Sequence, residues 1–354
     1  MLTHECKGNA SYKHLSIKQE NIDLYYKNKP RIFATVPGKC YLCKDLFSNN
    51  PQRFYFTMKR IILLLVSLLP VLSAFSQKEK DLTLLKEQIQ AIIHSCKAQV
   101  GVAFIWNGQD TLSINNDRPY PLMSVFKFHQ ALAVTHWLET RHLSLDTVLY
   151  ITPEDLKPDT YSPLRDRYPQ GNCSLSVREL LKYTLQQSDN NACDILFRLT
   201  GGPQETDRYI RSLGCSHFSI TATEDDMHVD LNRSYDNWTT PLEAARLLEF
   251  FLTRELFRPS DRQFIRQTLT ECETGKDRLV KPIPSGKAVI GHKTGTGDCN
   301  AQGQIIGIND IGFFLLPDGS RYSLAVFVKN SEEDAPATAG VIAAISEAVW
   351  NFVQ

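Results

Sequence analysis

The sequence predicts an α+β fold: an antiparallel sheet assembled from both ends of the chain and flanked by terminal helices, with an all-α domain inserted between them. Strand-like segments occur early, over residues 100–106 and 111–114, and again late, over 305–316 and 322–329. The residues between, roughly 121–274, show apolar side chains at helical spacing instead. One sheet must then be built from distant parts of the chain, and we expect a cleft where it meets the helices.

The N-terminal elements follow from local patterns. Apolar residues recur at helical spacing over residues 81–93, which predicts an amphipathic helix lying on the sheet. Residues 100–106 follow as a strand, Asn107-Gly108 as a turn and residues 111–114 as the partner strand. Asn-Gly favours the backbone of a two-residue turn, so these segments are predicted to form a hairpin.

The middle of the chain is predicted to be helical, and its end returns to the sheet. Six helices are expected in the middle, over residues 125–139, 177–187, 191–198, 202–213, 241–254 and 261–270. The two late strands flank the turn Pro317-Asp318-Gly319, and residues 335–353 form a closing helix. No internal repeat interrupts this plan.

An export signal is predicted inside the sequence rather than at its start. Met58 is followed by Lys59 and Arg60 and then by an apolar run that ends in small residues before Gln77. This pattern is typical of a secretory signal peptide over residues 58–76. A retained membrane anchor is the alternative, but the run is shorter than the roughly 20 residues that cross a bilayer. We therefore expect an exported, periplasmic protein with no stable membrane span after cleavage.

The segment that precedes this signal, residues 1–57, is predicted to be an over-extended, disordered upstream segment, with translation starting at Met58. It is polar and lacks clear periodicity. Its Cys40-x-x-Cys43 pair has no second pair close by, so zinc or redox chemistry is not favoured there.

The folded domain is expected over residues 77–354. Residues 77–120 and 275–354 would form its α/β part, and residues 121–274 its helical part. About 280 residues are enough to bury a large core without covalent crosslinks. The domain is predicted to be a monomer.

Composition narrows the class of function. The 354 residues carry 39 basic and 39 acidic side chains, which argues against a nucleic-acid partner because such proteins usually carry an excess of positive charge. His228 and His292 lack the neighbouring ligands of a zinc site, so no metal and no cofactor is expected. Six cysteines follow residue 76, and both disulfides and free thiols remain possible for them: Cys96, Cys173, Cys193, Cys215, Cys272 and Cys299.

The first motif with chemical content is Ser124-x-x-Lys127, at the predicted start of a helix. A three-residue step places both side chains on one helix face, about 5–6 Å apart at Cβ. A serine hydroxyl becomes a good nucleophile when a neighbouring group takes its proton, and the helix N-terminus can stabilise negative charge that develops nearby. By itself, this tetrapeptide is more often an ordinary helix surface.

Two further motifs follow. Ser188-Asp189-Asn190 lies between two predicted helices, where it can present a hydroxyl and an amide to the cleft, although Ser-Asp-Asn is also a common helix cap. Lys293-Thr294-Gly295-Thr296 follows an apolar strand, which we expect at the sheet edge. A cation, a hydroxyl and a glycine there suit a substrate carboxylate and carbonyl. A strand that ends in a glycine turn is the alternative.

The order S-x-x-K, S-D-N, K-T-G resembles the signature of class A serine β-lactamases and penicillin-binding proteins. The resemblance covers residues 77–354 and implies the β-lactamase/transpeptidase-like fold. It implies hydrolysis of the β-lactam ring of penicillins and cephalosporins through an acyl-enzyme on Ser124, which gives antibiotic resistance. A D-Ala-D-Ala carboxypeptidase or penicillin-binding protein is the alternative, and a penicillin-sensing receptor domain is a more distant one.

The resemblance also points to the group that separates a hydrolase from these alternatives. In class A enzymes a loop after the S-D-N motif carries the base that activates water for deacylation, and Glu224 occupies that place if Met227 and His228 take the usual Leu and Asn positions. Asp225 and Asp226 are candidates if the alignment slips.

Departures from the family pattern surround Glu224. Ala222 stands where an Arg is usual, Asp225 replaces a Pro, and the usual Asp partner of that Arg is Asn237. We expect a loop without this ion pair to be held differently. With His228 and the Asn237-Trp238 pair, the pattern resembles the PER-type extended-spectrum branch, whose members favour cephalosporins.

The resemblance assigns roles to the remaining residues. Lys127, or Glu224 through a water, takes the proton of Ser124; the N–H groups of Ser124 and Thr296 hold the oxyanion; and Ser188 protonates the departing nitrogen. Asn190 binds the side-chain amide of the substrate, while Lys293, Thr294 and Arg278 bind its carboxylate next to Gly295. Tyr161 and His228 border the cleft. For Tyr161 a half-exposed loop aromatic, and for Arg278 a surface arginine, are the alternatives.

Overall fold

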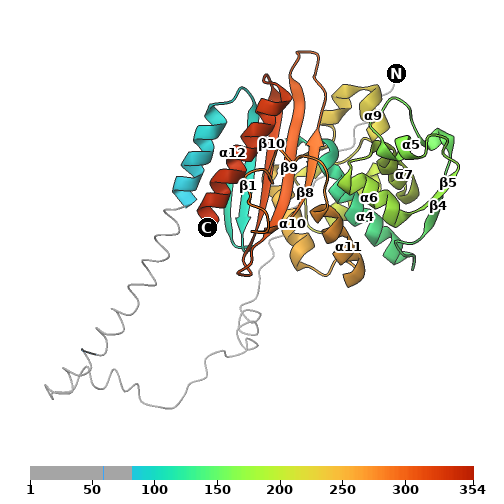
Figure 1. The fold of residues 1–354 in the computed structure, drawn as a ribbon, viewed down its shortest axis with the longest axis horizontal. Coiled ribbons are helices and arrows are strands. Elements are labelled where there is room, and N and C mark those ends of the chain that lie inside the picture. Colours follow the sequence, from blue (N-terminus) through green and yellow to red (C-terminus); the bar gives the residue numbers. More distant parts are fainter. Residues whose placement is uncertain (1–58, 60–81) are drawn as a thin grey trace, which may run out of the picture. The chain divides into compact units, whose positions relative to one another are not determined.

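The computed structural model describes Lys59 and residues 82–354 (Figure 1). The predicted upstream segment 1–57 and, apart from Lys59, the predicted signal peptide 58–76 lie outside these residues.

A five-stranded antiparallel sheet divides the described part into two layers (Figure 1). Its order is β2 (Asp110–Ile114), β1 (Gln99–Trp106), β10 (Arg321–Ser331), β9 (Ile305–Leu315) and β8 (Val289–Thr296). Strand β1, near the start, pairs with β10, near the end, so the prediction of one sheet built from distant segments is confirmed. The edge position expected for the K-T-G strand is confirmed too, because β8 borders only β9.

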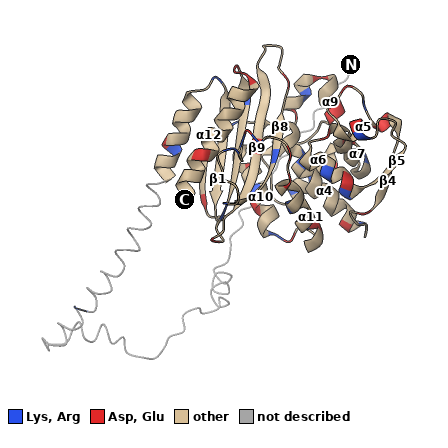
Figure 2. Cartoon of the chain, in the orientation of Figure 1, with Lys and Arg blue, Asp and Glu red and all other residues tan. Residues whose placement is uncertain are grey.

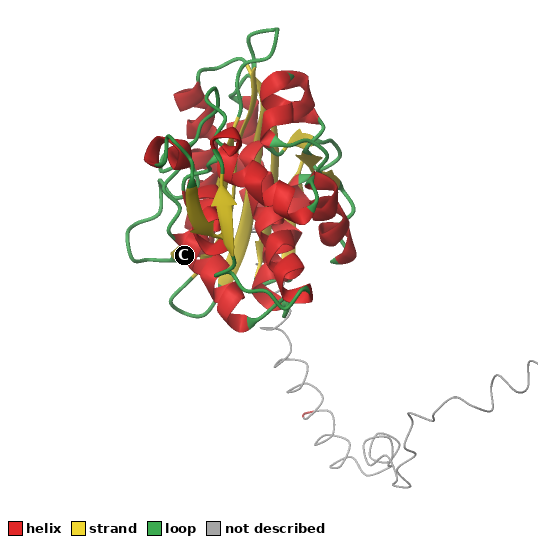
Figure 3. Cartoon of the chain, turned by 90° about the vertical axis from the view of Figure 1, so that its right-hand side faces the viewer, coloured by secondary structure: helices red, strands yellow, loops and turns green. Residues whose placement is uncertain are grey.

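Successive side chains of β1 point into two separate cores, as strand geometry requires. Val102 and Phe104 pack on one side against α12 (Ala335–Val353) and the helix over residues 82–94. Ala103 and Ile105 face the helical region instead. Both faces are covered, which is why β1 reads as a continuous apolar run. Figure 3 shows helices on both sides of the sheet.

The helical region is built around one buried helix. Helix α4 (Phe126–Thr140) buries Phe126, Lys127 and most of the positions up to Leu138. The other helices of this region pack around it or on the sheet: α5 (Pro163–Arg167), α6 (Val177–Gln186), α7 (Asn190–Thr200), α8 (Pro203–Ser212), α9 (Glu224–Val229), α10 (Pro241–Thr253) and α11 (Pro259–Thr270). Because α4 is buried nearly all round, its sequence is apolar rather than amphipathic.

The structure adds short elements that the periodicity did not predict. The 3₁₀ turns are η1 (Met123–Val125), η2 (Pro153–Asp155) and η3 (Leu231–Tyr235). Two small sheets join β3 (Tyr120–Pro121), β7 (Trp238–Thr239) and β6 (Phe218–Ser219), and β4 (Val148–Ile151) with β5 (Cys173–Ser176). The helix predicted from residue 125 begins as η1, and α4 follows at Phe126.

Helix α12 has the length and apolar composition of a membrane-spanning helix. It packs on the sheet, however, with Ile342, Ile345 and Val349 buried against β9 and β10. Acidic and basic residues are interspersed over the described elements rather than gathered on one of them (Figure 2).

Candidate active site

The serine of the first motif sits where two elements nearly touch. Met123, directly before Ser124, has a positive φ of 46°, which turns the chain sharply into α4. A Cβ on Gly295 of β8 would lie 2.7 Å from the Leu122 carbonyl oxygen and 2.9 Å from the Met123 Cβ. Only glycine therefore lets the β8 backbone pass this close to the serine.

Lys127 connects the first motif to the S-D-N motif and to Glu224. Its ammonium group donates to Ser124 Oγ at 3.0 Å, to the Ser188 carbonyl oxygen at 2.7 Å and to Asn190 Oδ1 at 2.6 Å. Its Nζ also lies 2.8 Å from Glu224 Oε1. The side chain is fully buried, and these acceptors replace the water that a buried charge loses.

A buried aspartate fixes the S-D-N motif. Asp189 begins α7 as its N-cap, accepting from the Ala192 N–H at 2.8 Å, and it also accepts from the Leu164 N–H and the Ser162 hydroxyl at 2.6 and 2.9 Å. Ser188 adopts a positive φ of 62° just before this cap. The helix cap and the functional loop are thus the same feature, and the two interpretations of this motif are compatible.

Lys293 on β8 reaches the same loop from the other side. Its ammonium group donates to Ser188 Oγ at 2.9 Å and to the Thr294 carbonyl oxygen at 2.8 Å. Burial and the positive charge of Lys127 lower the pKa of Lys293 to about 7. A lysine with this pKa changes charge near neutral pH, which makes it able to exchange a proton with Ser188.

Glu224 is the first residue of α9. Thr223 caps that helix, its hydroxyl accepting from the Asp226 N–H at 3.1 Å, while the Asp226 carboxylate accepts from the Thr223 N–H at 3.0 Å. The Glu224 Oε1 lies 3.4 Å from Ser124 Oγ, and its side chain is only 10% exposed. Asp225 points elsewhere, forming an exposed ion pair with Lys157, so the slipped alignment is not supported.

The sequence did not reveal the residue that positions Glu224. Asp194, on α7, accepts from the Glu224 and Asp225 N–H groups, both at 2.9 Å. Burial and the nearby Glu224 charge raise the pKa of Asp194 to about 7. The contact spans 30 residues and belongs to no motif, so the only available signal was an acidic residue on the helix after the S-D-N element.

The loop without the usual ion pair is held by a neutral side chain. Asn237 is fully buried, and its Oδ1 accepts from the Thr221 and Ala222 N–H groups at 2.8 and 2.9 Å. Its Nδ2 donates to the Ala222 carbonyl oxygen at 2.8 Å. An ion pair between Arg233 and Asp226 ties α9 to η3.

Arg278 is buried rather than on the surface, so the surface alternative is wrong. Its guanidinium donates to the Gly295 and Asn309 carbonyl oxygens at 2.9 Å each, and to Thr296 Oγ1 at 2.6 Å. The positive charge therefore lies next to the Thr296 hydroxyl of β8.

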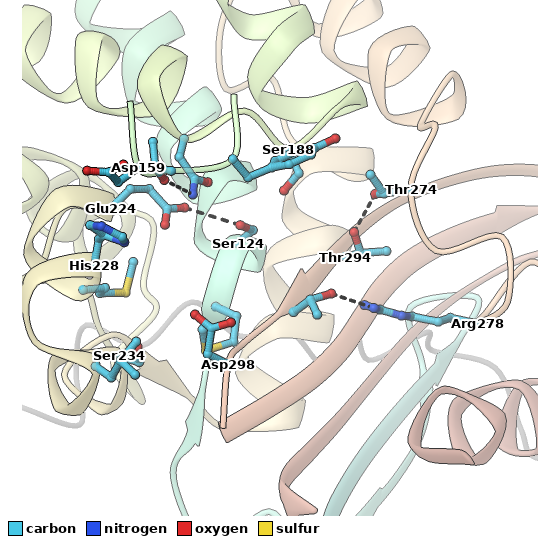
Figure 4. Close-up of a pocket in the computed structure, with 17 residues that line it drawn as sticks. Ser124, Asp159, Ser188, Glu224, His228, Ser234, Thr274, Arg278, Thr294 and Asp298 are labelled. Carbon is cyan, nitrogen blue, oxygen red and sulfur yellow. Dashed lines mark hydrogen bonds between the residues drawn. The ribbon is translucent and has the colours of Figure 1, made fainter. Parts of the chain in front are cut away.

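These residues of the predicted site line one cavity of about 500 Å³: Ser124, Ser188, Asn190, Glu224, Arg278, Thr294 and Thr296. Lys127 and Lys293 are buried and are not part of its lining. Figure 4 shows Ser124 in its middle, with Glu224 and His228 on one side and Thr294 and Arg278 on the other. Tyr161 also lines the cavity and is 58% exposed. His228 is exposed and lines the same cavity. Asp159 and Asp298 line the cavity too and were not predicted.

His292 lies outside the cavity and is buried, with Nδ1 at 3.0 Å from Asp310 Oδ1. Within residues 82–354 and Lys59, no group of three or more His, Cys, Asp or Glu side chains is arranged to hold a metal ion. The six cysteines of residues 82–354 are free thiols.

Comparisons with known proteins agree with this geometry. Residues 84–353 match the model described as the β-lactamase enzyme family. A β-lactamase of Bacteroides uniformis is 39% identical over 278 residues, 78% of this chain and 94% of that protein. The extended-spectrum β-lactamase PER-1 of Pseudomonas aeruginosa is 36% identical over 271 residues, 76% of this chain and 87% of that protein. The crystal structure of the TLA-1 extended-spectrum β-lactamase is similar with a TM-score of 0.74 and 40% identity, covering 76% of this chain and 98% of that one.

Proposed function

The chain belongs to the β-lactamase enzyme family, and on that premise we propose that Ser124 is its nucleophile and Glu224 its deacylation base. The prediction of a class A serine β-lactamase with the β-lactamase/transpeptidase-like fold is confirmed by the family match and the class A relatives. The protein hydrolyses β-lactams, and the comparisons give no support to the carboxypeptidase alternative.

Acylation begins when the Ser124 hydroxyl attacks the lactam carbonyl. Two groups can take its proton: Glu224 Oε1 at 3.4 Å, and Lys127 Nζ at 3.0 Å after Lys127 has passed a proton to Glu224 over 2.8 Å. Both routes leave the proton within one hydrogen-bonded cluster. The backbone N–H groups of Ser124 and Thr296 hold the oxyanion, a role that the close approach of β8 to η1 supports.

Ring opening needs a proton on the departing nitrogen. Ser188 Oγ supplies it and is replenished by Lys293, whose Nζ lies 2.9 Å away and whose pKa is lowered to about 7 by burial and by Lys127. After acylation, Glu224 releases its proton to solvent and Lys293 takes one up. The Glu224 carboxylate then takes a proton from the water that attacks the ester and returns it to Ser124 Oγ. The ester breaks, and Ser124 recovers its hydroxyl.

Substrate binding uses the wall formed by β8. Lys293, Thr294 and Thr296 bind the substrate carboxylate beside Gly295, and the buried Arg278 reinforces the positive field through its bond to the Thr296 hydroxyl. Asn190 Oδ1 accepts from Lys127, and its Nδ2 donates one hydrogen to Thr160 Oγ1. The second Nδ2 hydrogen is left for the substrate's side-chain amide. Tyr161 packs on the bound substrate, and His228 borders it.

The single observation that carries the proposed roles is the carboxylate of Glu224 inside the nucleophile cluster, since deacylation requires a base there. The test mixes the purified full chain with a chromogenic cephalosporin and follows turnover and the mass of the protein. The parent should turn over many times, and Glu224→Ala should stall as a covalent adduct on Ser124.

Asp225→Ala is the matched control, because it removes the adjacent carboxylate and should keep turnover. A stalled adduct in Asp225→Ala with normal turnover in Glu224→Ala would mean that the alignment is off by one residue. A single turnover in the parent would contradict Glu224 as a deacylation base.

We propose further that the 58–76 signal is cleaved before Gln77, that residues 77–354 form the mature domain and that it acts as a monomer in the periplasm. The basic residues Lys59 and Arg60, the apolar run after them and the small residues before Gln77 support this location. Expression from Met58 in a Gram-negative host, followed by fractionation, N-terminal sequencing and light scattering, tests all three points.

The similarity to extended-spectrum relatives supports a preference of this enzyme for cephalosporins. Comparing kcat/KM values for cephalosporins and penicillins would test this preference.

A further inference from the structure

A second nucleophile cluster lies behind β8, on residues that lactam hydrolysis does not use. The Cys272 thiol, just after α11, lies near the His292 ring, which acts on the pKa of the thiol. Nδ1 of that ring lies 3.0 Å from Asp310 Oδ1, and both of these partners are buried, 4% and 0% exposed. Thiol, imidazole and carboxylate thus follow one another in the order that activates a cysteine.

The charges around Cys272 favour its ionised form. Burial alone would lower the pKa of His292, yet Asp310 and Cys272 together raise it to about 10. Burial would likewise raise the pKa of Cys272, but the neighbouring His292 and the charge of Lys293 lower it below its ordinary value. A cationic imidazole beside a thiol is the arrangement that yields thiolates.

Other charged groups near the Cys272 thiol do not outweigh the positive charges that favour its ionised form. Arg278, from the segment before β8, also interacts electrostatically with Cys272. Glu271 and Glu273 flank Cys272 in sequence, but their side chains are exposed, and Glu271 is bonded to Gln186 and Gln267. The charges packed against the thiol are therefore mainly positive.

Cys272 also differs from the packing cysteines in access. It is half-buried, whereas Cys193 is fully buried and its pKa is raised by that burial. Among the cysteines of residues 82–354, Cys272 combines partial exposure of the residue with a neighbouring imidazole that lowers the pKa of its thiol. Reactivity requires both.

The thiol is connected to the hydrolytic pocket through one residue. Cys272 Sγ lies 3.4 Å from Thr274 Oγ1, which lies 2.6 Å from Thr294 Oγ1 (Figure 4 shows the second contact). Thr274 and Thr294 both line the cavity. A group added to Sγ must therefore move the Thr274 hydroxyl and disturb Thr294.

We propose that Cys272 is a modification site for small disulfides, and that its modification inhibits hydrolysis through Thr274 and Thr294. The thiolate sulfur attacks one sulfur of the disulfide; a new S–S bond to Cys272 forms while the old S–S bond breaks. The second sulfur leaves as a thiolate and takes a proton from solvent. A thiol reductant reverses the step.

The test uses the full chain and 2-hydroxyethyl disulfide, a neutral probe, with the rate at each cysteine followed by peptide mass spectrometry. Between about pH 8 and about pH 6 a thiol that titrates near 8.5 loses reactivity by ~100-fold. The rate at Cys272 should fall less steeply than the rate of such a thiol over the same interval, because the pKa of Cys272 is lowered. Cys299, whose side chain is exposed, is the reference. A rate at Cys272 that falls in parallel with Cys299, or no labelling at Cys272 at all, overturns the proposal.

Two variants separate the thiol's activation from its effect on the pocket. His292→Gln should give Cys272 the steep pH dependence of an ordinary thiol, with circular dichroism confirming that the variant is folded. Cys272→Ser should hydrolyse the chromogenic cephalosporin normally and resist the disulfide, while the parent loses at least about fivefold of its activity and recovers with reductant. Complete labelling of Cys272 with unchanged hydrolysis would overturn the inhibition.

Discussion

The two walls of the active-site cavity are held by different kinds of contact. The β8 wall, with Lys293 to Thr296, is registered residue by residue against β9 in the sheet. The α9 wall, with Glu224, is held by side chains that bond to backbone N–H groups, chiefly Asp194 and Asn237. The pairing of β8 with β9 is stabilised by many backbone hydrogen bonds, whereas the α9 wall depends on a few side-chain hydrogen bonds. We therefore expect the α9 wall to be the more easily altered.

The difference also divides the chemistry. The β8 wall carries the groups proposed to bind the substrate carboxylate and to feed protons to Ser188, so changes there should affect kcat/KM. The α9 wall carries the proposed deacylation base, so changes there should affect the decay of the acyl-enzyme. Each variant below tests whether this division holds.

The largest effect should come from the β8 wall, with Lys293→Met. The variant loses the donor to Ser188 and the cation for the substrate carboxylate, so kcat/KM should fall by ~100- to 1000-fold. The acyl-enzyme, once formed, should decay at the parental rate, as rapid-quench mass spectrometry would measure. A slowed decay instead would mean that the two walls do not act separately.

The same lysine predicts a pH dependence. Its pKa is lowered to about 7 by burial and by Lys127, so above that pH it loses its charge and kcat/KM should fall by up to about tenfold for each pH unit. Over the same range its contribution to stability rises, because the unfolded state still holds the proton up to about 10.4. Lys293→Arg keeps its charge and should shift the fall in kcat/KM to higher pH.

A smaller effect is expected at the α9 wall from Asp194→Ala. Removing the acceptor for the Glu224 and Asp225 N–H groups loosens the start of α9, and the acyl-enzyme should decay about tenfold more slowly, ~1.4 kcal/mol in barrier. Burst kinetics with a cephalosporin would measure both phases. Asp194→Asn keeps one acceptor oxygen, so its acyl-enzyme should decay at a rate between those of the parent and of Asp194→Ala. Unchanged decay in both variants would show that Thr223 and Asp226 alone position Glu224.

The smallest effect on chemistry should come from Asn237→Ala. It leaves the Thr221 and Ala222 N–H groups without their acceptor and should lower the free energy of unfolding by about 1–3 kcal/mol. Denaturant unfolding would measure the loss. If the α9 wall is loosened as well, limited proteolysis should cut first within residues 221–236. Asn237→Asp retains acceptors for both N–H groups and should lose less.

The same contrast explains what could be predicted from sequence. The β8 wall lies on a regular strand after an apolar run, so periodicity and the K-T-G motif located both the element and its side chains. Helix α12 and strands β1, β9 and β10 were found for the same reason, because their patterns extend over many residues.

The α9 wall was located only by its place after the S-D-N motif. What holds it, Asp194 and the amide of Asn237, involves contacts across 30 and about 15 residues that no pattern records. Strands of two residues, such as β6 and β7, are too short to show a period. Arg278 carried no signal that distinguishes a buried arginine from an exposed one.

The pairing of β1 with β10 has a consequence for the time at which the enzyme becomes active. The register couples Gln99 with Lys329, and β9 and β8 are added beyond β10. The long chain segment between β1 and β10 must close into a loop before their contacts can stabilise the sheet. This requirement slows folding. A partly synthesised chain already carries Ser124 and Lys127, but lacks the strand that completes their pocket. Hydrolysis can therefore begin only after the whole domain has been made.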